Sequence, residues 1–163
     1  MRHSKKVVLA LGSNLGNRRE NLAAALGMIG DFCRVAYCSR IYQTPPVGYA
    51  DQRDFLNAAL AAETDCDPFE LLALCKALES KIGRRATFRN GPRAIDIDII
   101  FYGDLSFEEE GLTLPHPRWS ERDFVKTPLL DLFESGALAS GFPIGVREIL
   151  ERTARAFAPY SAF

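Results

Sequence analysis

The order of strand-like and helix-like segments constrains the fold of this chain more than any other feature. Runs of apolar or alternating residues typical of strands occur at positions 7–11, 34–42, 55–64 and 95–101. Helical patterns lie between them, at residues 17–29 and 67–82. The resulting order, β-α-β-β-α-β, is that of the ferredoxin-like sandwich, in which two helices cover one face of an antiparallel sheet. We therefore predict an α+β fold of this kind with a C-terminal extension.

Both helices have clear start signals, and the second also has a stop signal. Asp67 is suited to the N-cap of the second helix, Pro68 to its first position and Glu70 to its first turn. Gly83 follows the expected last turn and favours a stop there. Asn17 is suited to the N-cap of the first helix. The sequence thus predicts two helices with defined ends.

The connections outside these elements differ in length. Residues 43–52 are too many for a tight hairpin, and Pro45 and Pro46 stiffen them, so this loop is a candidate wall of a binding site. Residues 107–163 are expected to be mostly irregular, with one helix near 146–156. At 163 residues the chain is most simply one domain, residues 1–163.

Composition indicates a soluble globular protein. Apolar residues make up 47% of the chain and charged residues 25%, with a net charge of -1, which gives no general reason to expect nucleic acid or an anionic membrane as partner. No apolar run approaches the ~20 residues of a membrane span, and the start lacks the apolar core of a signal peptide, so a cytoplasmic protein is expected. The four cysteines form no Cys-x-x-Cys pair, which favours reduced thiols over a zinc site.

Residues 90–100 (NGPRAIDIDII) join a rigid turn to a strand that carries two carboxylates. Pro92 fixes its own φ and restricts the residue before it, so Arg93 is delivered at the start of the strand. Alternate residues of a strand share a face, ~7 Å apart at ~3.3 Å per residue, so Asp96 and Asp98 should point the same way. The opposite face should hold the apolar residues of the segment, which are Ile95, Ile97, Ile99 and Phe101.

Two carboxylates this close repel each other unless a cation lies between them. Oxygen ligands favour Mg²⁺ or Mn²⁺, and Mg²⁺ is commonly held by one or two carboxylates together with substrate phosphates and water. Arg93 is then placed to bind a phosphate oxygen with its guanidinium fork. The alternative is an edge strand whose polar face is simply solvated.

Two further groups of residues fit a phosphate site. Arginines 84, 85, 89 and 93 form a cationic connection suited to polyphosphate, although such a loop is also common as solvated surface or a nucleic-acid patch. His116 lies in a proline-fixed turn close to Arg122 and Phe124, so this group is suited to a nucleotide phosphate and an aromatic substrate, or belongs to surface and core. No nucleophile constellation is recognisable, which favours transfer chemistry based on positioning and charge stabilisation. The glycines of residues 12–16 are interpreted as a turn for close backbone packing.

Five sequence blocks resemble one family in order and spacing. They are residues 11–16 (LGSNLG), 42–46 (YQTPP), 55–59 (FLNAA), 91–99 (GPRAIDIDI) and 115–117 (PHP). Together they are similar to the 6-hydroxymethyl-7,8-dihydropterin pyrophosphokinases, and the resemblance covers nearly the whole chain. It implies a folate-pathway enzyme that moves the β,γ-pyrophosphoryl group of ATP to the pterin hydroxymethyl oxygen and releases AMP.

The resemblance also implies a role for individual residues. Two Mg²⁺ ions would be held by Asp96 and Asp98, and catalysis would further involve Arg84 and Arg93. The ATP side would comprise Glu79, Arg84, Arg93, Ile99, Thr113, His116 and Arg122. The pterin side would comprise Thr44, Pro45, Val47, Phe55, Asn57 and Phe124, with the two phenylalanines sandwiching the flat ring. A neighbouring folate-pathway enzyme is a candidate partner.

One departure from the family concerns the residue before the Gly-Pro-Arg turn. Many members have a tryptophan there that closes over the substrates, whereas this chain has Asn90, so closure would need other groups such as Phe88 or Arg89. Two alternatives to the pyrophosphokinase remain. One is a non-catalytic ferredoxin-like module that binds a small ligand. The other is a different Mg²⁺-dependent enzyme that uses nucleotides, such as a nucleotidyltransferase or a phosphatase.

Overall fold

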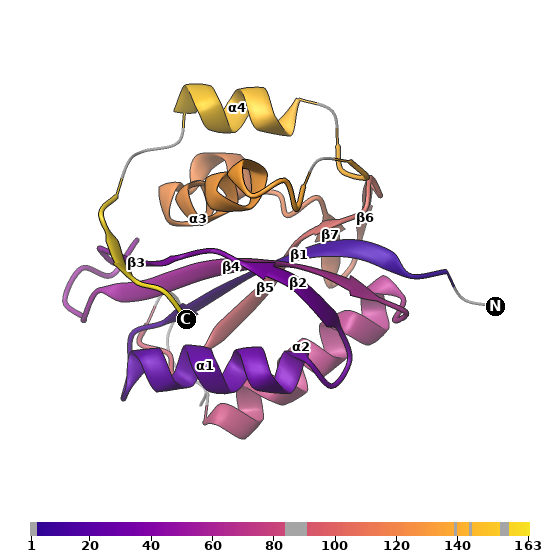
Figure 1. The fold of residues 1–163 in the computed structure, drawn as a ribbon. Helices are drawn as coiled ribbons and strands as arrows, with labels where there is room; N and C mark the ends of the chain where they lie inside the picture. The colour runs from indigo at the N-terminus through magenta and orange to yellow at the C-terminus, as the bar shows by residue number, and fades with distance from the viewer. Residues whose placement is uncertain (1–2, 84–90, 139, 144, 154–156) are drawn as a thin grey trace.

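The structure is a computed structural model that describes residues 3–163 except 84–90, 139, 144 and 154–156. Its main sheet lies between two layers of helices (Figure 1). The elements are β1 Lys5–Ser13, α1 Arg18–Ile29, β2 Arg34–Cys38, β3 Ile41–Thr44, β4 Phe55–Thr64, α2 Pro68–Ile82, β5 Asp96–Tyr102, β6 Phe107–Glu109, β7 Leu112–Leu114, the 3₁₀ helix η1 Trp119–Glu121, α3 Asp123–Glu134, α4 Val146–Thr153 and β8 Pro159–Ser161.

The main sheet has the strand order β5-β1-β4-β3-β8, and β2 also pairs with β4. All of its pairs are antiparallel. β1 lies between β4 and β5, so the start of β5, the end of β1 and the start of β4 meet at the same end of the sheet. The antiparallel sheet and the order β-α-β-β-α-β confirm the predicted ferredoxin-like core.

The helices α1 and α2 cover one face of the sheet, as expected. Their ends follow the predicted signals: the Asn17 side chain accepts a hydrogen bond from the Glu20 N–H at 3.2 Å, and Asp67 and Glu70 form a reciprocal capping box. Gly83 ends α2 with a φ of 106°, a left-handed conformation that glycine adopts readily. Cys75 is fully buried in the core on this face, and all four cysteines are free.

The expectation that residues 107–163 are mostly irregular was wrong. They contain the β6–β7 hairpin, η1, α3, α4 and β8. Helix α3 packs on the other face of the sheet, and α4 lies over α3 on the side away from the sheet (Figure 1). The local signal for α3 is weak because Arg122 provides no side-chain cap and Pro128, a residue disfavoured in helix interiors, lies inside the helix. The helix is stabilised by packing instead, since Leu129 and Leu132 are fully buried against the sheet. The predicted helix near 146–156 corresponds to α4, which the structure describes as far as Thr153.

Two strand predictions need correction. The segment 34–42 forms two strands rather than one, because Ser39 interrupts it and exchanges hydrogen bonds with the backbone of Ala59. The pairing of β1 with β5 shifts register between Val8 and Leu9, which places one extra residue in β5. Strand alternation had predicted Phe101 on the same side as Ile97. Because of the register shift, Phe101 packs on the α3 side instead.

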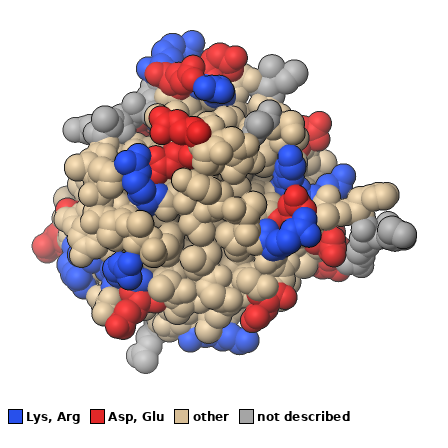
Figure 2. Space-filling view, in the orientation of Figure 1, with Lys and Arg blue, Asp and Glu red and all other residues tan. Residues whose placement is uncertain are grey.

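The surface carries charges of both signs. On the face drawn in Figure 2, basic and acidic side chains lie around an uncharged centre. No helix among the described residues is long and apolar enough to cross a membrane.

Candidate active site

A cleft of about 530 Å³ lies on the face of the sheet that α3 covers, where β1, β4 and β5 meet. Its volume is in the range of sites that enclose a small organic ligand. Five segments and the C-terminal tail contribute side chains. The lining residues are Ala10, Leu11, Gly12, Thr44, Pro45, Pro46, Val47, Gly48, Phe55, Asn57, Arg93, Asp96, Asp98, Arg118, Glu121, Arg122, Asp123, Phe124, Val125 and Phe157.

Gly12 forms the floor of the cleft. It belongs to β1 and pairs with Asn57 of β4 on one side and Asp96 of β5 on the other. A Cβ atom at this position would lie 2.8 Å from Asn57 Oδ1 and 3.4 Å from a ring carbon of Phe55. The residue was expected in a turn after the strand, but the structure places it within the strand. Glycine is needed here because the Asn57 and Phe55 side chains cross over it.

Polar groups with fixed directions line one wall of the cleft. Asn57 Nδ2 donates to Thr44 Oγ1 at 2.6 Å, and both side chains are buried. Because the amide nitrogen is engaged in this way, Asn57 Oδ1 is the atom that faces the floor at Gly12. The wall therefore presents a hydrogen-bond acceptor of defined orientation to a ligand in the cleft.

Of the three aromatic rings that line the cleft among the described residues, Phe55 and Phe124 each have an arginine over them. The guanidinium carbon of Arg93 lies 6.0 Å from the ring centroid of Phe55, and that of Arg122 lies 5.6 Å from the centroid of Phe124. These are cation–π distances, which restrict the rings and keep positive charge near the ligand space. An aromatic, anionic ligand matches this lining.

The carboxylates Asp96 and Asp98 both line the cleft from β5. Arg93 Nη1 donates to Asp96 Oδ2 at 2.8 Å, and each of these side chains is 20% exposed. Burial raises the pKa of Asp98 to about 6, and the negative charge of Asp96 adds to the rise. Asp98 is thus a carboxylate whose charge is poorly compensated by the protein, which is the situation that a bound cation relieves.

The donor set fits a hard divalent cation. Among the described residues no group of three or more His, Cys, Asp or Glu side chains is arranged around a common point. Two carboxylate side chains are instead what Mg²⁺ usually takes from a protein when substrate phosphates and water supply its remaining ligands.

Asn14 holds the turn that carries Arg93. Its side-chain Oδ1 accepts from the Arg93 N–H at 2.8 Å, and its own N–H donates to the Arg93 carbonyl at 3.0 Å. Asn14 Nδ2 also donates to Gln52 Oε1 and to the Arg53 carbonyl, at 2.8 and 3.0 Å. With 1% of its surface exposed, Asn14 ties the ends of β1, the β3–β4 loop and the Gly-Pro-Arg turn together. The sequence interpretation missed this role, although a polar residue directly after a buried strand was the available signal.

His116 is a neutral imidazole. Its backbone N–H donates to the Ile100 carbonyl at 2.9 Å, and its Nδ1 accepts from the Arg118 N–H at 3.2 Å. Burial, together with the positive charge of Arg122, lowers the pKa of His116 to about 4. Since Nδ1 is an acceptor, the single proton of the neutral ring lies on Nε2, which is therefore a donor.

Comparison with known proteins decides the family. Residues 8–134 match the family described as 7,8-dihydro-6-hydroxymethylpterin-pyrophosphokinase (HPPK). The chain belongs to this family. The 2-amino-4-hydroxy-6-hydroxymethyldihydropteridine pyrophosphokinase of Bacillus subtilis is 43% identical over 126 residues, which are 76% of this chain and 75% of that HPPK. The corresponding HPPK of Aquifex aeolicus is 39% identical over 126 residues, which are 77% of this chain and 79% of that HPPK.

Other relatives of this HPPK chain are longer. The mitochondrial folate synthesis bifunctional protein of Arabidopsis thaliana is 46% identical over 132 residues, which are 80% of this chain and 24% of that protein. A crystal structure of Plasmodium falciparum HPPK-DHPS A437G with pteroate superimposes with a TM-score of 0.67 at 16% identity, covering 93% of this chain and 43% of that one. The chain thus spans a quarter to less than half of these longer proteins. The structural likeness concerns the fold, which it confirms.

The structure brings most of the predicted HPPK site residues to the cleft. All six residues expected on the pterin side line it, as do Arg93, Asp96, Asp98 and Arg122. Their roles toward substrates stay predictions.

Four residues expected on the ATP side lie apart from the cleft lining. Glu79 is buried in α2, and its Oε1 accepts from the Ile97 N–H at 2.8 Å, so it supports the outer edge of β5. The side chain of Ile99 is buried in the core, which leaves its backbone as the group available to a nucleotide. Thr113 lies in β7, and His116 follows that strand. Arg84, together with the other predicted closure residues of the segment 84–90, lies outside the described residues.

The sequence interpretation missed several residues that line the cleft. Arg118, Glu121 and Asp123 come from η1 and the start of α3, which had not been predicted as helices. Phe157 comes from the C-terminal tail, beyond the residues that match the family. No local sequence signal marks Phe157, because its position depends on how the tail returns to the sheet.

Proposed function

We propose that this protein transfers the pyrophosphoryl group of ATP to the hydroxymethyl oxygen of 6-hydroxymethyl-7,8-dihydropterin in folate biosynthesis. The products are AMP and the pterin diphosphate. The observation that carries the proposal is the joining of two half-sites in one cleft: Phe55, Phe124 and Asn57 suit a flat heteroaromatic ring, and Asp96 and Asp98 lie beside them. Membership of the family supplies the identity of the ring and of the transferred group.

In this proposal the pterin lies between Phe55 and Phe124. Stacking between two rings suits a flat bicycle, and its hydrogen-bonding edge faces Asn57. Asn57 Oδ1 accepts from a ring N–H or amino group, and the hydrogen bond from Asn57 Nδ2 to Thr44 Oγ1 at 2.6 Å holds the amide in this orientation. The Thr44 hydrogen bond therefore fixes the direction of an acceptor that suits a ligand with a donor at this edge.

Asp96 and Asp98 would hold Mg²⁺, and we propose two ions together with the triphosphate of ATP. Such ions would supply positive charge that neutralises the phosphates and the attacking and leaving oxygens. The high pKa of Asp98 supports this assignment, since burial and the charge of Asp96 make its ionised form costly without a cation. The protein contributes the fixed direction of both carboxylates, which share one face of β5.

The transfer forms one P–O bond and breaks another. The pterin hydroxymethyl oxygen attacks the β-phosphorus of ATP and gives its proton to solvent water, while the bond from that phosphorus to the bridging oxygen of the α-phosphate breaks and its electron pair leaves with AMP. Arg93 and Arg122 stabilise the charge on the phosphates, and His116 donates from Nε2 as a neutral group. With a pKa of about 4, the His116 ring takes up no second proton at physiological pH, so it acts as a neutral donor through its single N–H.

We also propose that the protein acts in the cytoplasm, close to other folate enzymes. Relatives whose printed names are folate synthesis bifunctional proteins contain this unit as part of a longer chain, which supports such an association. The fully buried thiol of Cys75 and the three other free cysteines suit a reducing compartment.

The test is an assay of purified protein with Mg²⁺, ATP and 6-hydroxymethyl-7,8-dihydropterin. AMP and the pterin diphosphate should appear in equal amounts and only when pterin is present. Asp98→Ala should lower turnover by roughly 100-fold or more, because charge stabilisation of the transferring group is lost. Formation of ADP, or nucleotide cleavage without pterin, would indicate a different Mg²⁺-dependent enzyme. Pterin binding without turnover, unaffected by Asp98→Ala, would indicate a binding module.

A further inference from the structure

The C-terminal tail reaches the cleft through one aromatic side chain. Phe157 lines the cleft together with Phe55 and Phe124, although it follows the family-matched residues 8–134 by more than twenty positions. Its segment continues into β8, Pro159–Ser161, at the edge of the main sheet. The tail is therefore part of the cleft wall and also part of the sheet.

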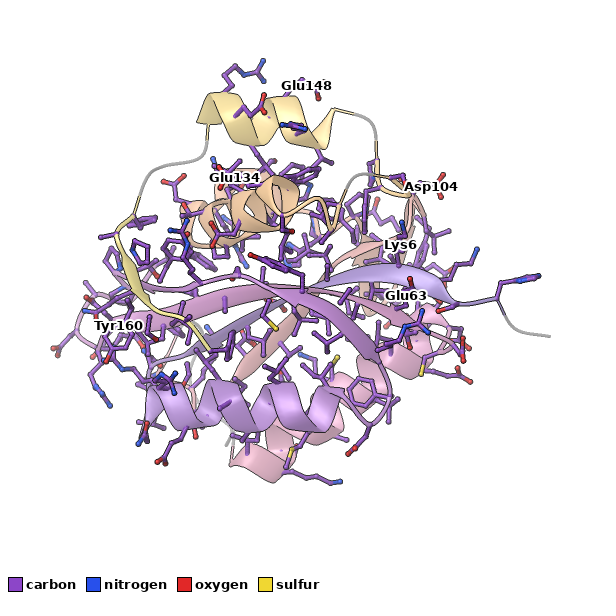
Figure 3. The ribbon with its side chains drawn as sticks, in the orientation of Figure 1. Lys6, Glu63, Asp104, Glu134, Glu148 and Tyr160 are labelled. Atoms are coloured by element: carbon purple, nitrogen blue, oxygen red, sulfur yellow. The ribbon has the colours of Figure 1, made fainter. Side chains whose placement is uncertain are left out.

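Three sets of contacts hold the tail in this place. Strand β8 pairs with β3, with Ile41 opposite Ser161 and Tyr42 opposite Pro159. The Arg19 guanidinium donates to the Ala162 carbonyl at 2.8 Å and to the Ser161 hydroxyl at 3.4 Å. The guanidinium carbon of Arg18 lies 6.0 Å from the ring centroid of Tyr160. Figure 3 shows Tyr160 on the tail beside the end of α1. These contacts fix the residues directly after Phe157.

The pairing register of β8 with β3 indicates where Phe157 lies along the sheet. The two strands are antiparallel, so the chain before Pro159 runs alongside β3 from Tyr42 toward Thr44. Phe157 lies two residues before Pro159, where β8 begins, and the same register continued over these two residues brings it to the level of Thr44. Thr44 is the residue whose hydroxyl accepts from Asn57 at 2.6 Å. The Phe157 ring is thus placed at the end of the cleft where the ligand's hydrogen-bonding edge would lie.

We propose that Phe157 is a third aromatic contact for the pterin, and that it sets the affinity and specificity of the pocket for a flat bicyclic heteroaromatic ligand. The inference rests on the proposed function for the identity of that ligand. Phe55 and Phe124 come from β4 and α3, whereas Phe157 comes from a third segment, the tail directly before β8. We expect Phe157 to affect the binding of pterin and not of ATP, because the carboxylates and arginines assigned to the phosphates come from other segments.

The test compares Phe157→Ala and Phe157→Leu with the wild-type protein and with Phe163→Ala. Phe163 is the matched control, because it belongs to the same tail and does not appear in the cleft lining. The dissociation constant for 6-hydroxymethylpterin is measured by fluorescence quenching, and KM values for pterin and ATP are measured in the assay. Phe157→Ala should raise the pterin constants about 10-fold and leave the KM of ATP within twofold. The pterin constants of Phe157→Leu should lie between those of wild type and Phe157→Ala. Those of Phe163→Ala should equal the wild-type values.

The outcomes separate this inference from the proposed function. If wild type makes AMP with pterin and Phe157→Ala keeps wild-type pterin constants, the inference is wrong while the proposed function stands. If Phe157→Ala and Phe163→Ala raise the KM of pterin and of ATP equally, the tail acts only on overall structure and the inference is likewise wrong. A wild-type protein that binds pterin through Phe157 without forming AMP would support the contact and overturn the proposed reaction.

Discussion

At the residue scale, Gly12 shows how one missing side chain shapes the pocket. An added Cβ atom would come within 2.8 Å of Asn57 Oδ1, the acceptor that faces the ligand space. We expect Gly12→Ala to push Asn57 aside and to raise the KM for pterin about 10-fold or more, because a polar group of the site is then misdirected. The measurement is steady-state kinetics with each substrate varied in turn.

A second glycine provides the control for this substitution. Gly27 lies in α1, and a Cβ atom added there meets no heavy atom within 4 Å. Gly27→Ala should leave both KM values unchanged and should stabilise the helix by roughly 0.5–1 kcal/mol. Unaltered pterin kinetics in Gly12→Ala would show that the pocket tolerates a displaced Asn57, contrary to the role given to it.

Asp98 illustrates a conflict between stability and function at a single residue. Its pKa is raised from 3.8 to about 6, mainly by burial, so without a cation its ionised form destabilises the folded protein above pH 6. Asp98→Asn should therefore be more stable than wild type at pH 7–8 in the presence of a chelator, by about 1–3 kcal/mol. The gain should shrink as the pH falls from 6 toward 4, because the folded wild type then takes up a proton. Urea denaturation at a series of pH values measures it.

The matched control for Asp98→Asn is a carboxylate away from the cleft. Asp104 is exposed in the turn after β5 and is labelled in Figure 3. Asp104→Asn should lack the gain in stability above pH 6. A stability difference between Asp98→Asn and wild type that is equal at pH 4 and pH 8 would contradict the assigned pKa.

At the element scale, the cleft depends on how β3 and α3 are joined. The Asp131 carboxylate of α3 accepts from the Tyr42 hydroxyl at 2.8 Å and from the Arg40 backbone N–H at 3.0 Å. Arg40 Nη2 also donates to Asp131 Oδ1 at 2.8 Å. The strand leads into Thr44 and the helix begins beside Phe124, so this junction sets the distance between two walls of the pocket.

We expect Asp131→Ala to lower the free energy of unfolding by about 2–3 kcal/mol, because it leaves the buried Tyr42 hydroxyl without its acceptor. The KM for pterin should rise as well, since the two walls lose their common support. Thermal and urea denaturation, together with kinetics, test both effects. The control is Arg147→Ala, which breaks only an exposed ion pair with Glu151 on α4 and should leave stability and kinetics unchanged. If Asp131→Ala is destabilised but keeps the wild-type KM for pterin, the β3–α3 junction does not set the geometry of the pocket.

At the scale of the whole molecule, the site exists because distant segments meet at one end of a sheet. Cleft residues come from β1, the β3–β4 loop, β4, β5, the η1–α3 region and the tail. The α1–α2 face of the sheet carries one core and the α3–α4 face carries another, and the cleft lies at the margin of the second. The antiparallel pairing fixes the positions of Asn57, Gly12 and Asp96 side by side across three strands.

The sequence by itself determined what local chemistry controls. The caps at Asn17 and Asp67, the stop at Gly83 and the shared face of Asp96 and Asp98 follow from backbone preferences and from the period of a strand. The six residues that the resemblance implied for the pterin side all line the cleft, and their roles toward a substrate stay predictions. All of these features depend on neighbours in the chain or on motifs that can be read in order.

Only the tertiary structure decided the features that depend on partners far away in the chain. The register shift that turns Phe101 to the α3 face, the α3 helix with its internal Pro128 and the return of Phe157 to the cleft are each fixed by packing against the sheet. The same holds for Asn14, whose three hydrogen-bond partners lie at positions 52, 53 and 93. Burial against the completed sheet outweighs local preference at these places, so no pattern of neighbouring residues reveals them.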